Sequence, residues 1–280
     1  MTLGLFVGGG DIPKLIAEHT KQSGDPIHLV VCKGYESDWM LGFSHEVCGL
    51  TEFGKQVRSL KKNGCDKLCI IGNVKRPDFS NLKPDMKGLK VLPKILKAAK
   101  KGDDSLLRAV VNIFESEGIQ VIGAHEVLSD LTLDAGIIGQ VVPAPDDVED
   151  ITKAYEIAGE IGALDIGQGA VVCSGLVLAV EAQEGTDEML KRVARLPDNI
   201  RGDENERRGA LVKRPKPMQE TRVDLPTLGV DTIRNAAAAG LKTVAVVEKS
   251  ALWVNIEEMR SLADTLGVAL VSLKSDGSLP

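Results

Sequence analysis

The segment from residue 211 to 229, LVKRPKPMQETRVDLPTLG, mixes cationic, carboxylate and amide side chains at short spacing. Lysine and arginine suit phosphate oxygens, whereas a hard divalent cation prefers carboxylate oxygens. If residues 220–224 are extended, the two-residue period of a strand places Glu220, Arg222 and Asp224 on one face. The segment therefore predicts a site for a phosphate and a metal ion. A strand at the edge of a sheet, protected by its charges, is the alternative.

Two lysines precede this predicted strand. Lys213 ends an apolar run, and Lys216 lies in a connection that Pro215 and Pro217 make stiff. We expect their ammonium groups to approach the same phosphate from the preceding strand, because a pyrophosphate needs positive charge around it.

Three other polar loops follow buried apolar runs, at Gly8–Asp11, Gly72–Pro77 and 123–126. In an α/β sheet such loops gather at the carboxyl ends of the strands, where ligands bind. Arg76 would suit phosphate recognition, and His125 lies in the neighbouring loop. A solvated loop and a structural histidine are the alternatives.

The glycines at 8, 9 and 10 let a backbone approach a phosphate or a sugar, but they are weak evidence for a nicotinamide cofactor. Pro13 stands where the third glycine of the dinucleotide fingerprint belongs, and no acid ends the second strand. Asp103 and Asp104 open one predicted helix, and Thr186 and Asp187 open another. Helix capping, with Asp103 as the cap, explains these acids without any ligand.

The elements that position these residues alternate in the first half of the chain, which predicts a parallel, Rossmann-like sheet with helices on its faces. The predicted strands are Leu3–Val7, Ile27–Cys32, Leu68–Ile71 and Ile119–Ile122, and the predicted helices are Ile12–Lys21, Phe53–Lys62 and Ser105–Glu117.

Pro143 to Val148 form the predicted linker, because two prolines followed by two acids end regular structure and then begin a helix. This divides the chain into an N-terminal α/β domain, 1–142, and a C-terminal mixed α/β domain, 149–280. The second domain is predicted from a helix at Val148–Ile161, a hairpin turning at Ser174–Gly175, a helix from about Thr186, strands at Ala210–Lys213, Thr221–Asp224, Thr243–Val247 and Ala269–Leu273, and helices at Val230–Ala239 and Ile256–Leu266.

Composition narrows the class of protein. The chain has 280 residues, 43% of them hydrophobic, and a net charge of −6, which argues against nucleic-acid binding. A local cationic pocket can still bind an anion. We find no secretory signal and no membrane-spanning run, and the five cysteines follow no CxxC pattern. These features predict a cytoplasmic protein with reduced thiols, and any metal would have oxygen ligands.

Six segments closely resemble the LpxI-type UDP-2,3-diacylglucosamine pyrophosphatases of lipid A biosynthesis. They are the glycine turn after the first strand, GNVKRPDF (72–79), KGDDSLLRAV (101–110), GAHEV (123–127), DIGQGAVVCSGLVLAVEAQEGTDEML (165–190) and the segment at 211–229. The resemblance spans nearly the whole chain. It implies Mg²⁺-dependent hydrolysis of the lipid nucleotide to UMP and 2,3-diacylglucosamine 1-phosphate (lipid X), with Mn²⁺ able to replace Mg²⁺. It also implies two domains with the ligand in a cleft between them.

The resemblance carries particular roles onto this sequence, with Asp224 as the essential metal-linked aspartate. The implied catalytic residues are Asp224, Gln219 and Lys213, and the implied metal ligands are Asp224, Glu220 and Asp187. The implied substrate-binding residues are Gly10, Asp11, Asn73, Arg76, Asp104, Gly123, Ala124, His125, Glu126, Gln168, Thr186, Lys213, Lys216 and Arg222.

Two other classes of function stay open: a noncatalytic nucleotide-sugar binding protein and, less favoured, a nicotinamide-dependent oxidoreductase. Binding alone does not call for a set of carboxylates, and the dinucleotide fingerprint is broken. A lipid substrate makes peripheral attachment to the inner membrane reasonable. The sequence leaves a homodimer open.

Overall fold

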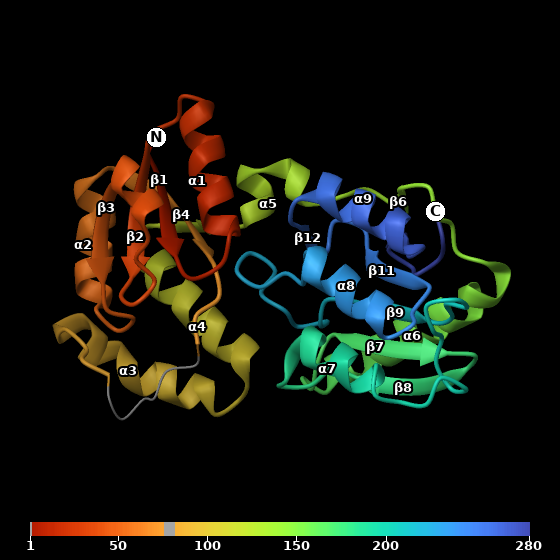
Figure 1. The fold of residues 1–280 in the computed structure, drawn as a ribbon. Coiled ribbons are helices and arrows are strands. Elements are labelled where there is room, and N and C mark those ends of the chain that lie inside the picture. The colour runs from red at the N-terminus through yellow and green to blue at the C-terminus, as the bar shows by residue number, and fades with distance from the viewer. Residues whose placement is uncertain (1, 76–81) are drawn as a thin grey trace. The chain divides into compact units, whose positions relative to one another are not determined.

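The computed structural model describes residues 2–75 and 82–280 (Figure 1). The chain forms two compact units. Unit 1 contains the residues up to Ser129 together with Glu220–Asp224, and unit 2 contains the remainder. The predicted linker at 143–148 falls inside unit 2, because strand β6 (Gly136–Ile138) already pairs antiparallel with β13 (Ala269–Leu273). Pro145 then begins a helix of unit 2.

In the described part of unit 1, five parallel strands form one sheet in the order β3-β2-β1-β4-β5. They are β1 (Thr2–Val7), β2 (Ile27–Cys32), β3 (Ser44–Cys48), β4 (Cys65–Ile71) and β5 (Gln120–Ile122). The predicted parallel sheet is confirmed, although β3 was not predicted. The strand order reverses between β1 and β4, which is where open parallel sheets bind ligands.

Helices cover both faces of this sheet, as side-chain alternation along β1 requires. The helices are α1 (Ile12–Gln22), α2 (Phe53–Lys62), α3 (Met86–Ala99), α4 (Asp103–Glu115) and α5 (Ala124–Val127). Phe6 of β1 packs with α2, α3 and α4 in one core cluster that includes Phe53, Ile95 and Phe114. Successive strand residues point to opposite faces, so Leu5 and Val7 face the side where α1 packs on β1 and β2.

Helix α3 has no counterpart among the predicted elements. Pro93 lies inside it, and a proline at such a position normally argues against a helix. The helix begins because the carboxylate of Asp85 accepts a hydrogen bond from the Gly88 N–H at 2.8 Å. The pKa of Asp85 is lowered although burial alone would raise it, since backbone N–H groups such as those of Gly88 and Lys55 stabilise its charged form.

The main sheet of unit 2 is mixed, in the order β6-β13-β11-β9-β7-β8. Besides β6 and β13, its strands are β7 (Gly169–Cys173), β8 (Leu176–Val180), β9 (Ala210–Lys213) and β11 (Thr243–Val247). β9, β11 and β13 run parallel, whereas β7 pairs antiparallel with both β8 and β9. The predicted hairpin at Ser174–Gly175 joins β7 to β8. A separate parallel pair consists of β10 (Thr227–Leu228) and β12 (Leu252–Trp253).

Unit 2 has three layers, with the sheet between two sets of helices. Its helices are α6 (Pro145–Ala163), α7 (Gly185–Val193), α8 (Val230–Ala238) and α9 (Ile256–Leu266). Val172 belongs to a core cluster with α6 residues such as Ile151, whereas its neighbour Val171 belongs to a cluster with Met189 of α7. Each unit therefore has its own hydrophobic core, as expected of a domain.

Candidate active site

The first polar loops of unit 1 are held together backbone to backbone. Gly9 and Asn73 exchange two hydrogen bonds of 2.9 Å between their N–H and C=O groups, which joins the loop after β1 to the loop after β4. A Cβ on Gly8 would lie 2.6 Å from the carbonyl oxygen of Gly72, so this approach requires glycine. Gly10 and Asp11 follow and are exposed. Arg76 lies outside the described residues.

The loop after β5 contributes His125 and Glu126. The Glu126 carboxylate accepts the Gly123 N–H at 2.7 Å, which orders the first turn of α5. The Nδ1 atom of His125 is buried and has no hydrogen-bond partner. A buried nitrogen without a partner is costly, so a ligand group at this atom would relieve a real penalty.

Residues 220–224 form a turn, so the predicted strand at Thr221–Asp224 is wrong. The N–H groups of Val223 and Asp224 both bond to the carbonyl oxygen of Glu220, at 3.0 and 3.1 Å. The turn is fixed from outside, because the Asp104 carboxylate accepts the Glu220 N–H at 2.7 Å. The five residues Glu220–Asp224 therefore belong to unit 1, although the chain on either side of them belongs to unit 2.

Arg222 is engaged in ion pairs within unit 1. Its guanidinium donates to both oxygens of Glu220, at 2.8 and 2.9 Å, and to Glu115 at 2.6 Å. The hydrogen bonds from Arg222 hold the pKa of Glu220 below its ordinary value, and the same bonds raise the pKa of Arg222. These pairs give Arg222 and Glu220 a structural role in anchoring the turn. They also weigh against Glu220 as a metal ligand, since both of its oxygens already accept hydrogen bonds.

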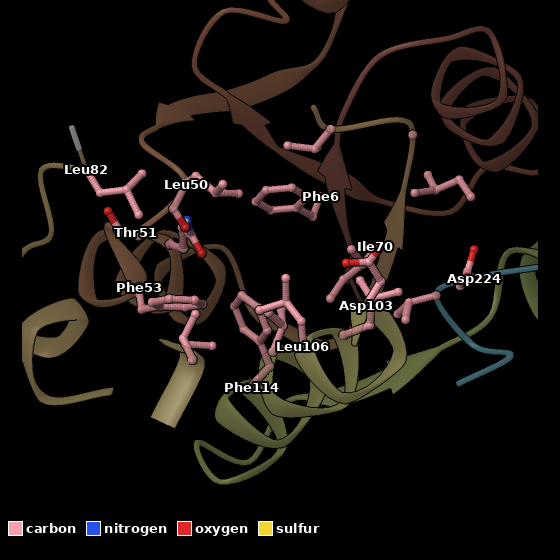
Figure 2. Close-up of a pocket in the computed structure, with 18 residues that line it drawn as sticks. Phe6, Leu50, Thr51, Phe53, Ile70, Leu82, Asp103, Leu106, Phe114 and Asp224 are labelled. Atoms are coloured by element: carbon pink, nitrogen blue, oxygen red, sulfur yellow. The ribbon is translucent and has the colours of Figure 1, made fainter. Parts of the chain in front are cut away.

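An apolar pocket of about 370 Å³ lies within unit 1, between the sheet and helices α2, α3 and α4 (Figure 2). Side chains such as Phe6, Phe53 and Phe114 line it. Asp103 and Asp224 are the carboxylates in this lining. Figure 2 shows these two aspartates toward one end of the pocket and Leu82 toward the other. The pocket thus combines a long apolar interior with acidic groups at one end.

The structure gives Asp103 and Asp104 contacts that the sequence did not predict. Gly102, rather than Asp103, is the N-cap of α4, and no side chain caps the start of this helix. Asp103 lines the pocket instead. Asp104, predicted to bind substrate, pairs with Arg108 at 2.9 Å and accepts the N–H of Glu220. Asp104 is therefore a positioning residue for the turn that carries Asp224.

Unit 2 holds a chain of buried polar groups around the end of β9. Lys213 is 4% exposed, and its ammonium donates to Thr186 Oγ1 at 2.7 Å. The Thr186 hydroxyl donates in turn to Glu181 Oε1 at 2.7 Å. The other Glu181 oxygen is buried without a hydrogen-bond partner. Glu181 thus orients Thr186, and Thr186 orients Lys213.

The remaining predicted residues of unit 2 surround the next segment of chain. Gln219 Oε1 accepts the Lys216 N–H at 2.8 Å, and Gln219 Nε2 lies 3.3 Å from Gln168 Oε1. The Lys216 ammonium pairs with Asp165 at 2.6 Å. Asp187 instead accepts a hydrogen bond from Asn235 at 3.0 Å. Lysine and amide groups are therefore fixed in one segment, as phosphate recognition requires.

The metal ligands predicted from the sequence belong to both units, Glu220 and Asp224 to unit 1 and Asp187 to unit 2. Within residues 2–75 and 82–280, no group of three or more His, Cys, Asp or Glu side chains has an arrangement that could hold a metal ion. Mg²⁺, however, is usually bound by one or two carboxylates together with substrate phosphates and water. Asp224 and Asp103 in one pocket lining fit that mode of binding.

Cysteine chemistry has no support in this structure. All five cysteines lie in the described part, and all are buried and unpaired. Burial raises the pKa of Cys48 and Cys65 to about 11 and that of Cys69 to about 12. A thiol must ionise to act as a nucleophile, so burial disfavours the reactive form of these thiols.

Comparison with known proteins identifies the family. Residues 2–131 match the LpxI N-terminal domain, and residues 134–271 match the LpxI C-terminal domain. The chain belongs to the LpxI family. UDP-2,3-diacylglucosamine pyrophosphatase LpxI of Caulobacter vibrioides is 51% identical over 271 residues, which cover 97% of each chain. The family's two domain boundaries leave only residues 132–133 unmatched between them.

Two residues that belong to the candidate site were missed from the sequence. Asp103 looked like a helix cap, and helix phase alone could not show that it lines a pocket. Glu181 ends an apolar run, and only the fold places it beside Thr186.

Among the helices of the described residues, none has the length and hydropathy needed to span a membrane.

Proposed function

We propose that this chain hydrolyses the pyrophosphate bond of UDP-2,3-diacylglucosamine and releases UMP and 2,3-diacylglucosamine 1-phosphate. The observation that carries the proposal is the apolar pocket of unit 1, which has Asp103 and Asp224 in its lining. An apolar interior with carboxylates at one end suits a molecule whose acyl chain is attached to a phosphorylated headgroup. The name of the Caulobacter vibrioides relative supports the same substrate.

The pocket accounts for binding of an acyl chain. Its volume of about 370 Å³ lies in the range of pockets that enclose small ligands. Aliphatic and phenylalanine side chains dominate its lining, so the apolar surface of the acyl chain would leave water on binding. Substrate lipid therefore binds in unit 1 through the hydrophobic effect.

The polar residues of unit 2 account for the phosphates. Lys213 and Lys216 bring positive charge, and Gln219 brings an amide that can donate to a phosphate oxygen. Lys213 is held by Thr186, so its ammonium is oriented before substrate arrives. A charge fixed in advance stabilises a transition state without reorganisation.

Asp224 acts on the attacking water. The water oxygen bonds to one phosphorus atom while the bond from that phosphorus to the bridging oxygen breaks. The bridging oxygen leaves on the second phosphate, and the proton lost by the water passes to solvent. The Asp224 carboxylate accepts a hydrogen bond from the water and directs its lone pair toward phosphorus. Mg²⁺, held by Asp224 and substrate oxygens with Asp103 nearby, would neutralise phosphate charge and polarise the attacked phosphorus. Mn²⁺, which accepts the same oxygen ligands, would replace it.

One assay separates this proposal from the two alternatives. Pure protein is incubated with UDP-2,3-diacylglucosamine and Mg²⁺, and nucleotide products are followed by chromatography. We expect UMP in equal amount to the sugar 1-phosphate, no UMP in EDTA, and recovery on addition of Mg²⁺ or Mn²⁺. Tight binding without UMP would identify a binding protein. A change in the oxidation state of NAD⁺ or NADH added to a parallel incubation, without UMP, would identify an oxidoreductase. Full turnover in chelated buffer would remove the metal from the account.

A further inference from the structure

Helix α3 exposes a stripe of apolar side chains. Met86 is 75% exposed, Leu89 54% and Leu96 36%, and Pro93 is also exposed. Their positions, 86, 89, 93 and 96, follow the spacing that brings residues to one face of a helix. Isolated exposed leucines are ordinary, but four apolar residues along one face form a surface that is unfavourable in water.

A stripe of lysines runs beside this apolar stripe. Lys90, Lys94 and Lys97 are exposed and are spaced by four and three residues, so they share the adjoining face, and Lys101 is exposed beyond the end of the helix. From residue 83 to 101 the chain has seven lysines and one acid, Asp85, although its total net charge is −6.

Acidic groups around α3 do not neutralise this stripe. Asp85 accepts backbone N–H groups at the start of the helix. Glu117 pairs with Lys87 at 2.5 Å and with Lys61 at 3.5 Å. Lys87, three residues before Lys90, lies on the same side of the helix and is the lysine there that pairs with an acid. No ion pair of Lys90, Lys94, Lys97 or Lys101 is seen among the described residues.

The opposite face of α3 fixes the orientation of the helix. Gly88, Ile95 and Ala99 are buried there. A Cβ on Gly88 would overlap the carbonyl oxygen of Thr51, so the helix lies directly against that backbone. Ile95 lines the apolar pocket. The exposed stripes are therefore held outward by packing on the unit 1 core.

We propose that the exposed face of α3 docks on an anionic lipid membrane. An amphipathic helix with lysines beside an apolar stripe lies in the membrane interface, with its apolar side chains among the upper acyl chains and its lysines near lipid phosphates. Charge complementarity selects this partner, because the stripe is cationic on an acidic protein. The same helix forms a wall of the acyl pocket, so docking brings that pocket to the surface where acylated substrate resides. This inference extends the proposed function, but membrane binding itself needs no turnover.

Vesicle sedimentation without substrate tests the docking. The full chain is mixed with two kinds of vesicle, one of phosphatidylcholine alone and one that also contains about 30% phosphatidylglycerol. The anionic lipid gives the second vesicle a negative surface potential. We expect the protein to bind the anionic vesicles, and to bind the neutral vesicles at least about 10-fold more weakly. Lys90→Glu/Lys94→Glu/Lys97→Glu should weaken anionic binding by about 100-fold, because each lysine near the surface contributes about tenfold or less. Lys14→Glu/Lys62→Glu/Lys274→Glu, which changes exposed lysines elsewhere by the same charge, should bind like the parent.

A second variant tests the apolar stripe. Met86→Ser/Leu89→Ser/Leu96→Ser keeps every charge and should weaken binding by about 10-fold or more, because less apolar surface enters the membrane. Equal binding of all variants, or equal binding to neutral and anionic vesicles, would overturn the proposal. Absence of vesicle binding together with self-association that the serine variant abolishes would show that the stripe is a protein interface instead.

Activity measurements separate this inference from the proposed function. The lysine variant should hydrolyse short-chain substrate dispersed in detergent at the parental rate, yet lose rate on substrate embedded in anionic vesicles. If no protein releases UMP but vesicle binding behaves as expected, the proposed function fails and the docking stands. If UMP forms normally while the α3 variants bind vesicles as the parent does, the docking proposal is wrong and the proposed function stands.

Discussion

The two units carry contrasting kinds of candidate site. Unit 1 offers an apolar pocket with Asp103 and Asp224 in its lining, and Arg222 of this unit is already paired with Glu220 and Glu115. Unit 2 offers lysine, hydroxyl and amide groups around the end of β9. The first kind of surface suits a lipid and a metal-assisted attack, and the second suits phosphate oxygens. Under the proposed function, the acyl chain and the phosphates would be recognised by these two different kinds of surface.

The largest expected effect concerns Asp224. Asp224→Ala should fold and still bind UDP-2,3-diacylglucosamine, while kcat falls about 10²-fold or more, because the lost carboxylate acts mainly in the transition state. Steady-state kinetics beside a melting curve measure both effects. Asp134→Ala, which removes a carboxylate that is 81% exposed and paired with Lys249, is the matched control. Near-normal kcat in a folded Asp224→Ala protein would show that the chemistry is elsewhere.

Lys213 provides the corresponding test of unit 2. Lys213→Met preserves much of the buried volume but removes the ammonium, so kcat/KM should fall by roughly 10- to 100-fold, the scale of a hydrogen bond to a charged group. The comparison variant Lys191→Met removes an exposed lysine of α7 that pairs with Glu188. Matching kinetics for the two variants would contradict a role of Lys213 in phosphate recognition.

The pocket predicts a smaller effect that depends on the substrate. Val110→Phe should fill part of the pocket and raise KM about 10-fold for long-chain substrate, with little change for an analogue with short acyl chains. Val148→Phe introduces the same change at a valine of α6 that is 37% exposed. A rise in KM that is independent of acyl length would mean that the lipid does not occupy this pocket.

The sequence predicted most elements of regular structure, and the structure corrects one of them beside the candidate site. Buried runs such as Ile27–Cys32 and Thr243–Val247 have the observed bounds, because local hydrophobic pattern and strand burial coincide there. The strand predicted at Thr221–Asp224 failed because Asp104, 116 residues from Glu220, holds that backbone in a turn. Alternating charges can predict a strand face, but they carry no information about a partner so distant in sequence.

The chemistry of individual residues was predictable only where it did not depend on such partners. Lys213 and Asp224 were singled out from residue type and resemblance, and their roles remain proposals. Asp103 and Asp104 are adjacent acids with the same helix propensity, so only the packing of α4 distinguishes the pocket residue from the positioning residue. Helix α3 was not predicted, and Pro93 within it is a residue that argues against a helix in the sequence.

The smallest expected effect concerns stability and tests the anchoring of the turn. Hydrogen bonds from Arg222 lower the folded-state pKa of Glu220, so their stabilisation is fully present above the unfolded pKa and is lost as pH falls through the folded value. Glu220→Gln should therefore lower the free energy of unfolding by about 1 kcal/mol at pH 7 and by less below about pH 4. Denaturant titrations at several pH values measure this difference. A constant difference from pH 7 to about pH 3 would exclude the charged pair as its cause.

The central claim is that the acyl pocket and the phosphate chemistry act on one lipid nucleotide. The most direct test compares kcat/KM for UMP release from UDP-2,3-diacylglucosamine and from UDP-glucosamine, which lacks both acyl chains, at the same Mg²⁺ concentration. We predict a preference of about 100-fold or more for the acylated substrate, since burial of even a few methylene groups contributes about 0.8 kcal/mol each. Equal kcat/KM for the two substrates, or no UMP from either, would contradict the account.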